Sequence, residues 1–288
     1  MRTLALRRRF VLSVALVPVV AAAAWIAHRS IGGGGPDAAG AGPSAGPHAV
    51  ASAKVPGAPA AQPSEVKTPS AAPKGSAALR YSFDGGLAAP VVDAGGRLPL
   101  KVRKVAGGEL SAVPHEGGLA VRFPPRCEHY GAESCARAIL QSGPADFLNP
   151  GQADFSFGAS VLVKPSETSK GANVMQKGFS VGDSQFKLQV DGAAGRPSCV
   201  IVGTGDSTIY VALASRSVAD GRWHRIECSR GGALLTVAVD GVVAGQAAIP
   251  PSLSIMNTDP LCIGGKGTSA NNDQFVGVID DVFVTRSA

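Results

Sequence analysis

Hydrophobic and polar positions alternate in short runs from Leu79 to the C-terminal end of the chain. A typical run is residues 234–240, LLTVAVD, in which Leu235, Val237 and Val239 share one face of an extended strand. Gly and Pro interrupt the sequence every several residues, so that no long helical stretch survives. About nine or ten strands at roughly ten-residue spacing predict an all-β sandwich or barrel. Strands are expected at residues 79–83, 155–163, 174–182, 185–191, 198–203, 208–213, 223–228, 234–240 and 275–284.

The segment 217–245, SVADGRWHRIECSRGGALLTVAVDGVVAG, predicts three consecutive antiparallel strands. Residues 230–232 and the pair Asp240-Gly241 offer the positive φ angles that tight turns require. Trp223 begins the first of the three strands, and its large apolar ring is expected to anchor the core. The alternative is a stacking platform for a sugar ring. With one tryptophan and three tyrosines in the predicted domain, an aromatic-lined groove is hard to assemble.

The first 76 residues are expected to lie outside the folded domain. Residues 1–30 carry three consecutive arginines ahead of an uncharged apolar run at 10–27, which predicts an export segment. That run is near the ~18-residue minimum for a spanning helix, so the segment is either a cleaved signal peptide or a retained single-pass anchor. Residues 31–76 are rich in Gly, Ala, Pro and Ser and predict a disordered linker. Residues 77–286 are then one exported sandwich, extracellular or at the cell surface, which touches a membrane only through 10–27.

The net charge of +6 comes from the N-terminal part of the chain. Residues 1–75 carry eight basic and two acidic side chains, whereas residues 76–288 carry 19 of each sign. A nucleic-acid partner requires a surface on which basic side chains outnumber acids, and the neutral domain has no basic run to build one. Nucleic-acid binding is therefore excluded as the expected function.

Patterns that could carry catalysis are incomplete. Residues 178–182, GFSVG, match the G-x-S-x-G nucleophile elbow, but a predicted strand follows where the elbow needs a helix. Residues 264–269, GGKGTS, lack the first glycine of a phosphate-binding loop. A glycosidase needs two carboxylates at a set separation, and the adjacent Asp280 and Asp281 point to opposite faces of one strand. No catalytic residue is expected. The alternative is a glycoside hydrolase or lyase with dispersed acidic residues.

Several separated motifs resemble the laminin G-like domains of the concanavalin A-like lectin/glucanase superfamily. They are D-G-x-W-H-x-I at 220–226, L-x-V-x-V-D-G at 235–241, FVGVIDDVFV at 275–284 and LRYSFDGG at 79–86. The resemblance implies a jelly-roll sandwich of two curved antiparallel sheets over 77–286. A subgroup of exported bacterial proteins is more closely similar, through the segments 127–140, 154–163, 173–180, 185–192 and 197–203.

All five cysteines lie in the part expected to be exported, where disulfides are favoured over metal thiolates. The resemblance to the bacterial subgroup implies two bridges, Cys127–Cys135 and Cys199–Cys228. Cys127 and Cys135 would close a short loop, and Cys199 and Cys228 fall in strands expected to be neighbours. Cys262 remains without an evident partner, as a buried free thiol or as one half of an intermolecular bridge.

Calcium is the cofactor that the family resemblance implies. Ca²⁺ takes six to eight oxygen ligands, and the candidates are Asp84 after the first strand with Asp280 or Asp281 in the last. Residues 271–273 form a separate possibility, and the alternative is that these acids are turn formers and solvated surface groups. We expect an exported, tethered, non-catalytic binding module whose ligand is a glycan, the cell wall or a protein. A purely structural accessory domain is a further alternative.

Overall fold

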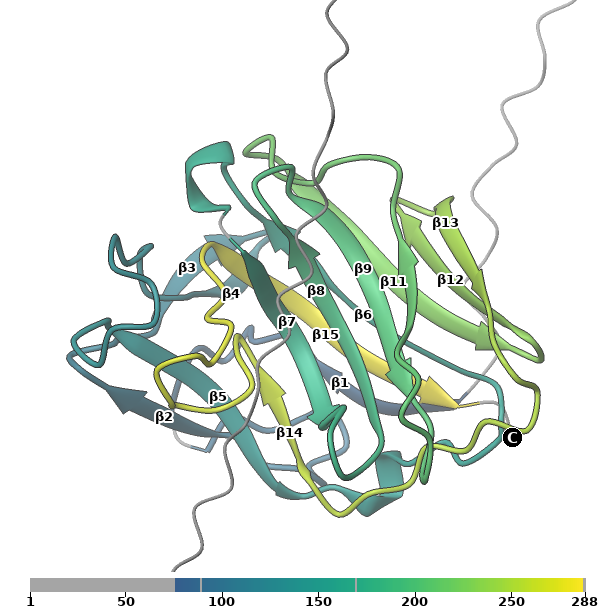
Figure 1. Cartoon of the computed structure of the whole chain (residues 1–288). Helices are drawn as coiled ribbons and strands as arrows, with labels where there is room; N and C mark the ends of the chain where they lie inside the picture. The colour runs from purple at the N-terminus through teal and green to yellow at the C-terminus, as the bar shows by residue number, and fades with distance from the viewer. Residues whose placement is uncertain (1–75, 89, 169, 287–288) are drawn as a thin grey trace, which may run out of the picture. The chain divides into compact units, whose positions relative to one another are not determined.

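The computed structural model describes residues 76–88, 90–168 and 170–286, which form a sandwich of two antiparallel β-sheets (Figure 1). Residues 1–75, which hold the predicted export segment and the predicted linker except its last residue, lie outside the described residues, and Ser76 begins the first strand. None of the described helices is long and apolar enough to cross a membrane. The two helices are the short 3-10 turns η1 (Asp146–Leu148) and η2 (Pro165–Glu167). The strands are β1 (Ser76–Tyr81), β2 (Lys101–Val105), β3 (Ser111–His115), β4 (Gly118–Arg122), β5 (Arg137–Pro144), β6 (Phe155–Leu162), β7 (Gly171–Gly178), β8 (Gln185–Asp191), β9 (Arg196–Val202), β10 (Tyr210–Leu213), β11 (Trp223–Gly231), β12 (Leu234–Val239), β13 (Val242–Ala248), β14 (Pro260–Ile263) and β15 (Val278–Arg286).

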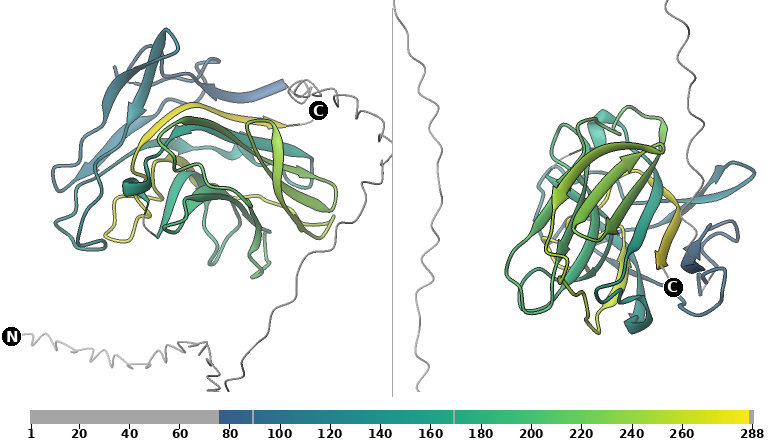
Figure 2. Two further views of the ribbon diagram at one scale, coloured as in Figure 1. Left: turned by 90° about the horizontal axis from the view of Figure 1, so that it is seen from above. Right: turned by 90° about the vertical axis from the view of Figure 1, so that its right-hand side faces the viewer.

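The strands divide between an eight-stranded and a seven-stranded sheet that lie as two layers (Figure 2). The eight-stranded sheet has the order β13-β12-β11-β6-β15-β4-β3, with β1 also paired to β15. The seven-stranded sheet has the order β10-β9-β8-β7-β14-β5-β2. The last two strands of the chain lie inside the sheets: β15 lies between β6 and β4 in the eight-stranded sheet, and β14 lies between β7 and β5 in the seven-stranded sheet. The expected all-β jelly-roll sandwich of two antiparallel sheets is confirmed, and the first strand, β1, pairs with the last, β15.

The core lies between the two sheets and follows the alternation of the sequence. Leu235 and Val237 of β12 are fully buried, as are Phe186 and Leu188 of β8 in the facing sheet. Burial of a side chain of this size contributes roughly 1.5–3 kcal/mol relative to exposure, so each of these buried positions stabilises the fold. The face assignment made from residues 234–240 is therefore confirmed.

The three consecutive strands predicted within 217–245 are present as β11, β12 and β13, joined in antiparallel pairs. Strand β12 ends at Val239 and β13 begins at Val242. The two residues between them, Asp240 and Gly241, have φ angles of 53° and 76°. Positive φ at both central positions is the mark of a type I′ hairpin turn, whose twist matches that of the flanking strands.

Trp223 does not belong to the core, which corrects the prediction made from its size. Ile226 and Cys228 of the same strand are fully buried between the sheets. Side chains alternate along a strand, so Trp223 shares the outer face with Arg225 rather than the inner face with Ile226. The indole is partly buried there, and its ring stacks on the ring of His115 with centroids 3.8 Å apart.

The structure contains two disulfides, Cys127–Cys135 and Cys199–Cys228, each with a Cα–Cα distance of 5.6 Å. The second joins β9 of the seven-stranded sheet to β11 of the eight-stranded sheet through the core. The expectation that Cys199 and Cys228 lie in neighbouring strands is therefore wrong, since these strands belong to different sheets. Cys262 is a free, buried cysteine on β14.

Candidate functional site

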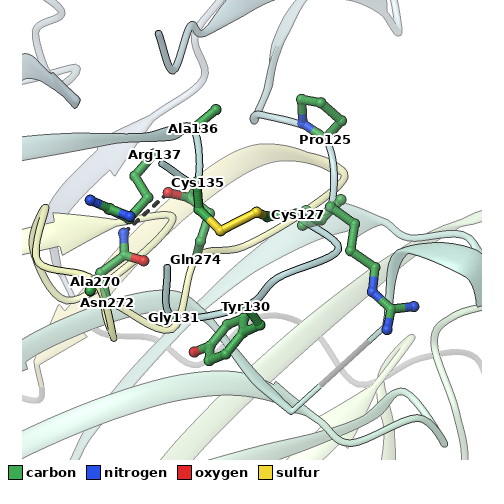
Figure 3. A pocket seen from close by; sticks show the side chains of 12 residues that line it. Pro125, Cys127, Tyr130, Gly131, Cys135, Ala136, Arg137, Ala270, Asn272 and Gln274 are labelled. Carbon is green, nitrogen blue, oxygen red and sulfur yellow. Dashed lines mark hydrogen bonds between the residues drawn. A yellow bond between two sulfur atoms is a disulfide. The ribbon is translucent and has the colours of Figure 1, made fainter. Parts of the chain in front are cut away.

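The loop closed by Cys127 and Cys135 borders a small pocket. Figure 3 shows the disulfide with Tyr130, Arg137 and Gln274 around it. The pocket has a volume of about 20 Å³, which is room for about one water molecule. It is therefore too small to be the binding site of a saccharide or peptide.

A much larger hollow lies on the outer face of the seven-stranded sheet. Its volume is about 320 Å³, within the range of roughly 300–1,000 Å³ that is usual for ligand pockets. Strands β7 and β8 form its floor, the turn between them forms one side, and the loop between β14 and β15 forms the other. The lining residues are Gln176, Phe179, Ser180, Val181, Gln185, Lys187, Lys266 and Asp273.

Because side chains alternate along β8, its polar side chains lie on the sheet face that carries this hollow. Phe186 and Leu188 point into the core, so Gln185, Lys187 and Gln189 between and beside them occupy the outer face. Sequence analysis assigned the segment QFKLQVD to a strand but did not single out its polar residues as a site. The signal that could have found them is the run of long polar side chains on one face of a central strand.

Hydrogen bonds hold the amide of Gln176, in the floor of the hollow, in a fixed orientation. Asn173 Nδ2 donates to Gln176 Oε1 at 2.6 Å, and Gln176 Nε2 donates to the Gly178 carbonyl at 2.6 Å. Asn173 and Gln176 are both buried, although they stand on the outer face of the sheet. Among the described residues, Asn173 Oδ1 has no hydrogen-bond partner and is a buried acceptor. A fixed array of this kind presents its groups to a ligand at little cost in side-chain entropy.

The charged side chains of the hollow differ in how they are partnered. Asp273 accepts hydrogen bonds from the Tyr130 hydroxyl at 3.1 Å and from Lys266 Nζ at 2.8 Å. Burial, with the negative charge of Asp273 beside it, raises the pKa of Tyr130 to about 12. Burial also lowers the pKa of Lys187, because its charged form loses hydration, and the nearby Asp273 opposes this shift.

The rim of the hollow is apolar. Phe179 and Val181, in the turn between β7 and β8, are 43% and 88% exposed. This turn contains the GFSVG sequence, and β8 begins at Gln185 directly after it, with no helix. The segment is thus a hairpin turn and not a nucleophile elbow, and the strand expected at 174–182 ends at Gly178. Its exposed side chains offer an apolar surface beside fixed polar groups, the usual composition of a ligand site.

The two aspartates proposed for calcium are directed at different partners. Asp280 Oδ2 accepts a hydrogen bond from His115 Nδ1 at 2.5 Å, and its Oδ1 accepts one from the Asp281 amide at 2.7 Å. Asp281 forms an ion pair with Arg80 at 2.7 Å. Burial raises the pKa of Asp280, and the hydrogen bonds from His115 and Asp281 oppose that shift. The oxygens of this pair therefore do not converge on one point.

Asp84 follows β1 and lies beside the β3–β4 hairpin, where its Oδ1 fills the space that a side chain on Gly118 would need. In the separate candidate group at residues 271–273, Asp273 is paired with Lys266. The described residues contain no group of three or more His, Cys, Asp and Glu that could hold a metal ion. Ca²⁺ also accepts amide and carbonyl oxygens, so its binding stays a prediction.

Melting curves of the full chain test calcium binding directly. A ligand that binds only the folded state raises the melting temperature. Because Asp280 and Asp281 are already engaged, we favour the alternative that these acids are turn and surface groups, and we expect the same melting temperature in EDTA and in millimolar calcium chloride. A higher melting temperature in calcium, reversed by chelator and lost in Asp280→Asn, would instead place an ion at these residues.

Residues 144–288 match the sequence model of the concanavalin A-like lectin/glucanases superfamily, and this match covers half of the chain. The chain belongs to the concanavalin A-like lectin/glucanases superfamily. The resemblance to laminin G-like domains drawn from the sequence motifs is thereby confirmed. No curated protein sequence matches the chain at a significant level.

Solved structures of the same fold belong to proteins of several kinds. Domain 4 of the extracellular arabinanase AbnA from Geobacillus stearothermophilus, solved with arabinotriose, is 16% identical with a TM-score of 0.54. That match covers 73% of this chain and 92% of the arabinanase domain. The binding domain of botulinum neurotoxin DC, solved with rat synaptotagmin II, is 10% identical with a TM-score of 0.52.

The match to the neurotoxin DC domain covers 73% of this chain and 48% of the toxin chain. A structure of botulinum neurotoxin type C, whose cell entry depends on interaction with two ganglioside molecules, is 9% identical with a TM-score of 0.50. The match to this structure covers 68% of the present chain and 45% of the toxin chain. The superfamily member described here thus spans about half the length of these toxin chains. At such low identities the similarity establishes a common fold and does not transfer a ligand.

Proposed function

We propose that this superfamily member is a non-catalytic module that binds a saccharide in the hollow on the outer face of the seven-stranded sheet. The observation that carries the proposal is the hollow of about 320 Å³, lined by the oriented amide of Gln176 and by two lysines and bordered by the exposed ring of Phe179. Sugars combine hydroxyl groups with apolar ring faces, and this lining offers partners for both. The arabinanase domain that shares the fold was solved with arabinotriose, which supports a glycan as the kind of ligand.

The position of the module outside the cell is part of the proposal. Its two disulfides fit an oxidising compartment, where such bonds form and persist. The export segment at residues 1–30 and the linker at 31–76 would then hold the binding domain away from the cell surface, or release it if the segment is cleaved.

The hollow does not offer the carboxyl pair of a glycosidase. Such enzymes need one acid that stays protonated and a second, ionised carboxylate across the scissile bond. Asp273 is the one carboxylate that lines the hollow among the described residues, and both of its oxygens accept hydrogen bonds from Tyr130 and Lys266. This arrangement supports binding without turnover.

Binding of the full chain to a glycan array tests the proposal. We expect retained saccharides, and we expect Phe179→Ala to weaken their binding about tenfold, or about 1.4 kcal/mol. Phe147→Ala is the matched control, since Phe147 is 41% exposed and does not line the hollow. The proposal fails if no saccharide is retained, or if both variants bind as the wild type does. Capture of a protein in place of any glycan would favour the protein-ligand alternative.

One observation favours the enzymatic alternative. Burial and the neighbouring Asp183 carboxylate raise the pKa of Asp259, near the start of β14. Two carboxyl groups whose environment keeps one of them protonated could act as acid and base. Turnover on a polysaccharide panel that Asp259→Asn abolishes would establish a glycoside hydrolase or lyase. We expect no turnover from the wild type.

A further inference from the structure

Lys187 is a cation without a direct anionic partner. It stands near the middle of β8, opposite Gln176 of β7 and Val200 of β9, and lines the floor of the hollow. Within the described residues, neither a hydrogen bond nor an ion pair engages its ammonium group, and it is partly buried. A partly buried charge without a partner is costly, because the protein does not replace the hydration that it loses.

The two carboxylates whose charges act on Lys187 are already engaged by other donors. Asp191 accepts from Gln189 Nε2 at 2.5 Å with one oxygen and from the Ser198 hydroxyl with the other. Asp273 accepts from Tyr130 with one oxygen and from Lys266 with the other. The charges of these two acids reduce the positive potential at Lys187, although neither acid forms an ion pair with it.

The second lysine of the hollow adds to this potential. Lys266 enters from the loop between β14 and β15, and its charge lies close enough to oppose protonation of Lys187. Lys266 forms an ion pair with Asp273. An anion that enters the hollow would therefore meet the unpaired ammonium group of Lys187 and the partly neutralised ammonium group of Lys266. The lining also contains two neutral side chains that are long and polar, those of Gln176 and Gln185.

We propose that the saccharide bound in this hollow is acidic, and that Lys187 binds its anionic group directly. This inference rests on the proposed function and names the class of its ligand. A carboxylate or sulfate on a sugar ring would form a charge-assisted hydrogen bond with the ammonium group, about twice as strong as a bond between neutral partners. The amides of Gln176 and Gln185 and the ring of Phe179 would contact the remainder of the sugar.

The test uses the full chain on an array of neutral chains, uronate- or sialate-bearing chains and sulfated chains. Each acidic carbohydrate that is retained is then titrated beside its methyl-esterified or desulfated form. We expect the acidic form to bind at least tenfold more tightly, and Lys187→Gln to remove this preference. The carboxylate and sulfate arms separate the two sources of the negative charge.

Two variants control for folding and net charge. Lys187→Arg keeps the charge and should retain most of the preference for the acidic form. Lys101→Gln removes the same charge from exposed β2, which lies four strands away from β8 in the same sheet, and should bind as the wild type does. Circular dichroism verifies the fold of each variant.

The outcomes separate this inference from the function on which it rests. Equal binding of acidic and neutral forms, unchanged by Lys187→Gln, would overturn the acidic ligand and leave the saccharide-binding module intact. Retention of no saccharide at all would overturn both proposals. A preference for acidic chains that Lys101→Gln reduces as much as Lys187→Gln would show a diffuse charge effect and would also overturn the role of Lys187.

Discussion

Replacement of both Cys199 and Cys228 by alanine is expected to lower the free energy of unfolding by roughly 3.5 kcal/mol. The bridge closes a loop with a sequence separation of 29, and its loss restores that freedom to the unfolded chain. For a domain of this size, the loss corresponds to a fall of about 7–14 °C in melting temperature. Thermal unfolding under non-reducing conditions, followed by circular dichroism, measures the change.

The matched control is the double replacement of Cys127 and Cys135. Their bridge spans a separation of only eight residues, so the same relation gives roughly 2.5 kcal/mol. The larger effect is expected at Cys199–Cys228 for a second reason, because both of its cysteines are fully buried between the sheets. Equal losses for the two double variants would contradict the view that the bridge between the sheets contributes more than the loop bridge.

Gly178→Ala is expected to destabilise the domain by more than about 4 kcal/mol, which is exceptional for a single substitution. Gly178 ends β7 with a φ of +80°, a conformation that costs an L-residue energy. A Cβ at this position would also stand 1.9 Å from the Ser184 carbonyl oxygen and 2.5 Å from Asn257 Nδ2. The first of these is a backbone atom that cannot move without disturbing the β7–β8 hairpin.

Gly182→Ala separates the backbone cost from the steric cost. Gly182 lies at the other end of the same turn with a φ of +79°, and a Cβ there would meet no atom within 4 Å. We expect this variant to lose only about 1–2 kcal/mol, the cost of the left-handed conformation alone. Chemical denaturation of both variants measures the difference. Similar losses at the two glycines would show that the contact with Ser184 is relieved by relaxation.

Trp223 shows what side-chain alternation along a strand can and cannot predict. Its size indicated a core residue, whereas the alternation that starts from Ile226 and Cys228 places it on the opposite face, as the structure confirms. The pattern of period two was present in the sequence, and the prediction failed because residue size was given more weight than position. The stacking of Trp223 on His115 could not be foreseen, since it depends on where the β3–β4 hairpin lies over the sheet.

The edge strands β2 and β3 were not predicted from the sequence, and the two share one physical reason. Strand β2, KVRKV, is exposed along most of its length at the edge of its sheet, and β3 contains Pro114. An edge strand buries little of either face, so its sequence need not alternate, and proline is tolerated there because one set of amides is unpaired. Their structure therefore comes from pairing with neighbours and not from a pattern of their own.

The candidate site is also predictable only in part from the sequence. Alternation within QFKLQVD places Lys187 on the face opposite to Phe186 and Leu188, and this much is readable from the chain. The sequence does not show that Lys266 and Asp273, more than 75 residues away along the chain, border the same hollow.

Side-chain alternation and turn chemistry are local, and they were enough to predict an all-β sandwich, the Asp240-Gly241 turn and the core face of β12. Which strands pair, and which of the two sheets each strand joins, depends on hydrogen bonds and packing between segments far apart in the chain. Those long-range contacts placed β9 and β11 in different sheets, directed Cys199 toward Cys228 across the core, and brought the loop after β14 beside Lys187.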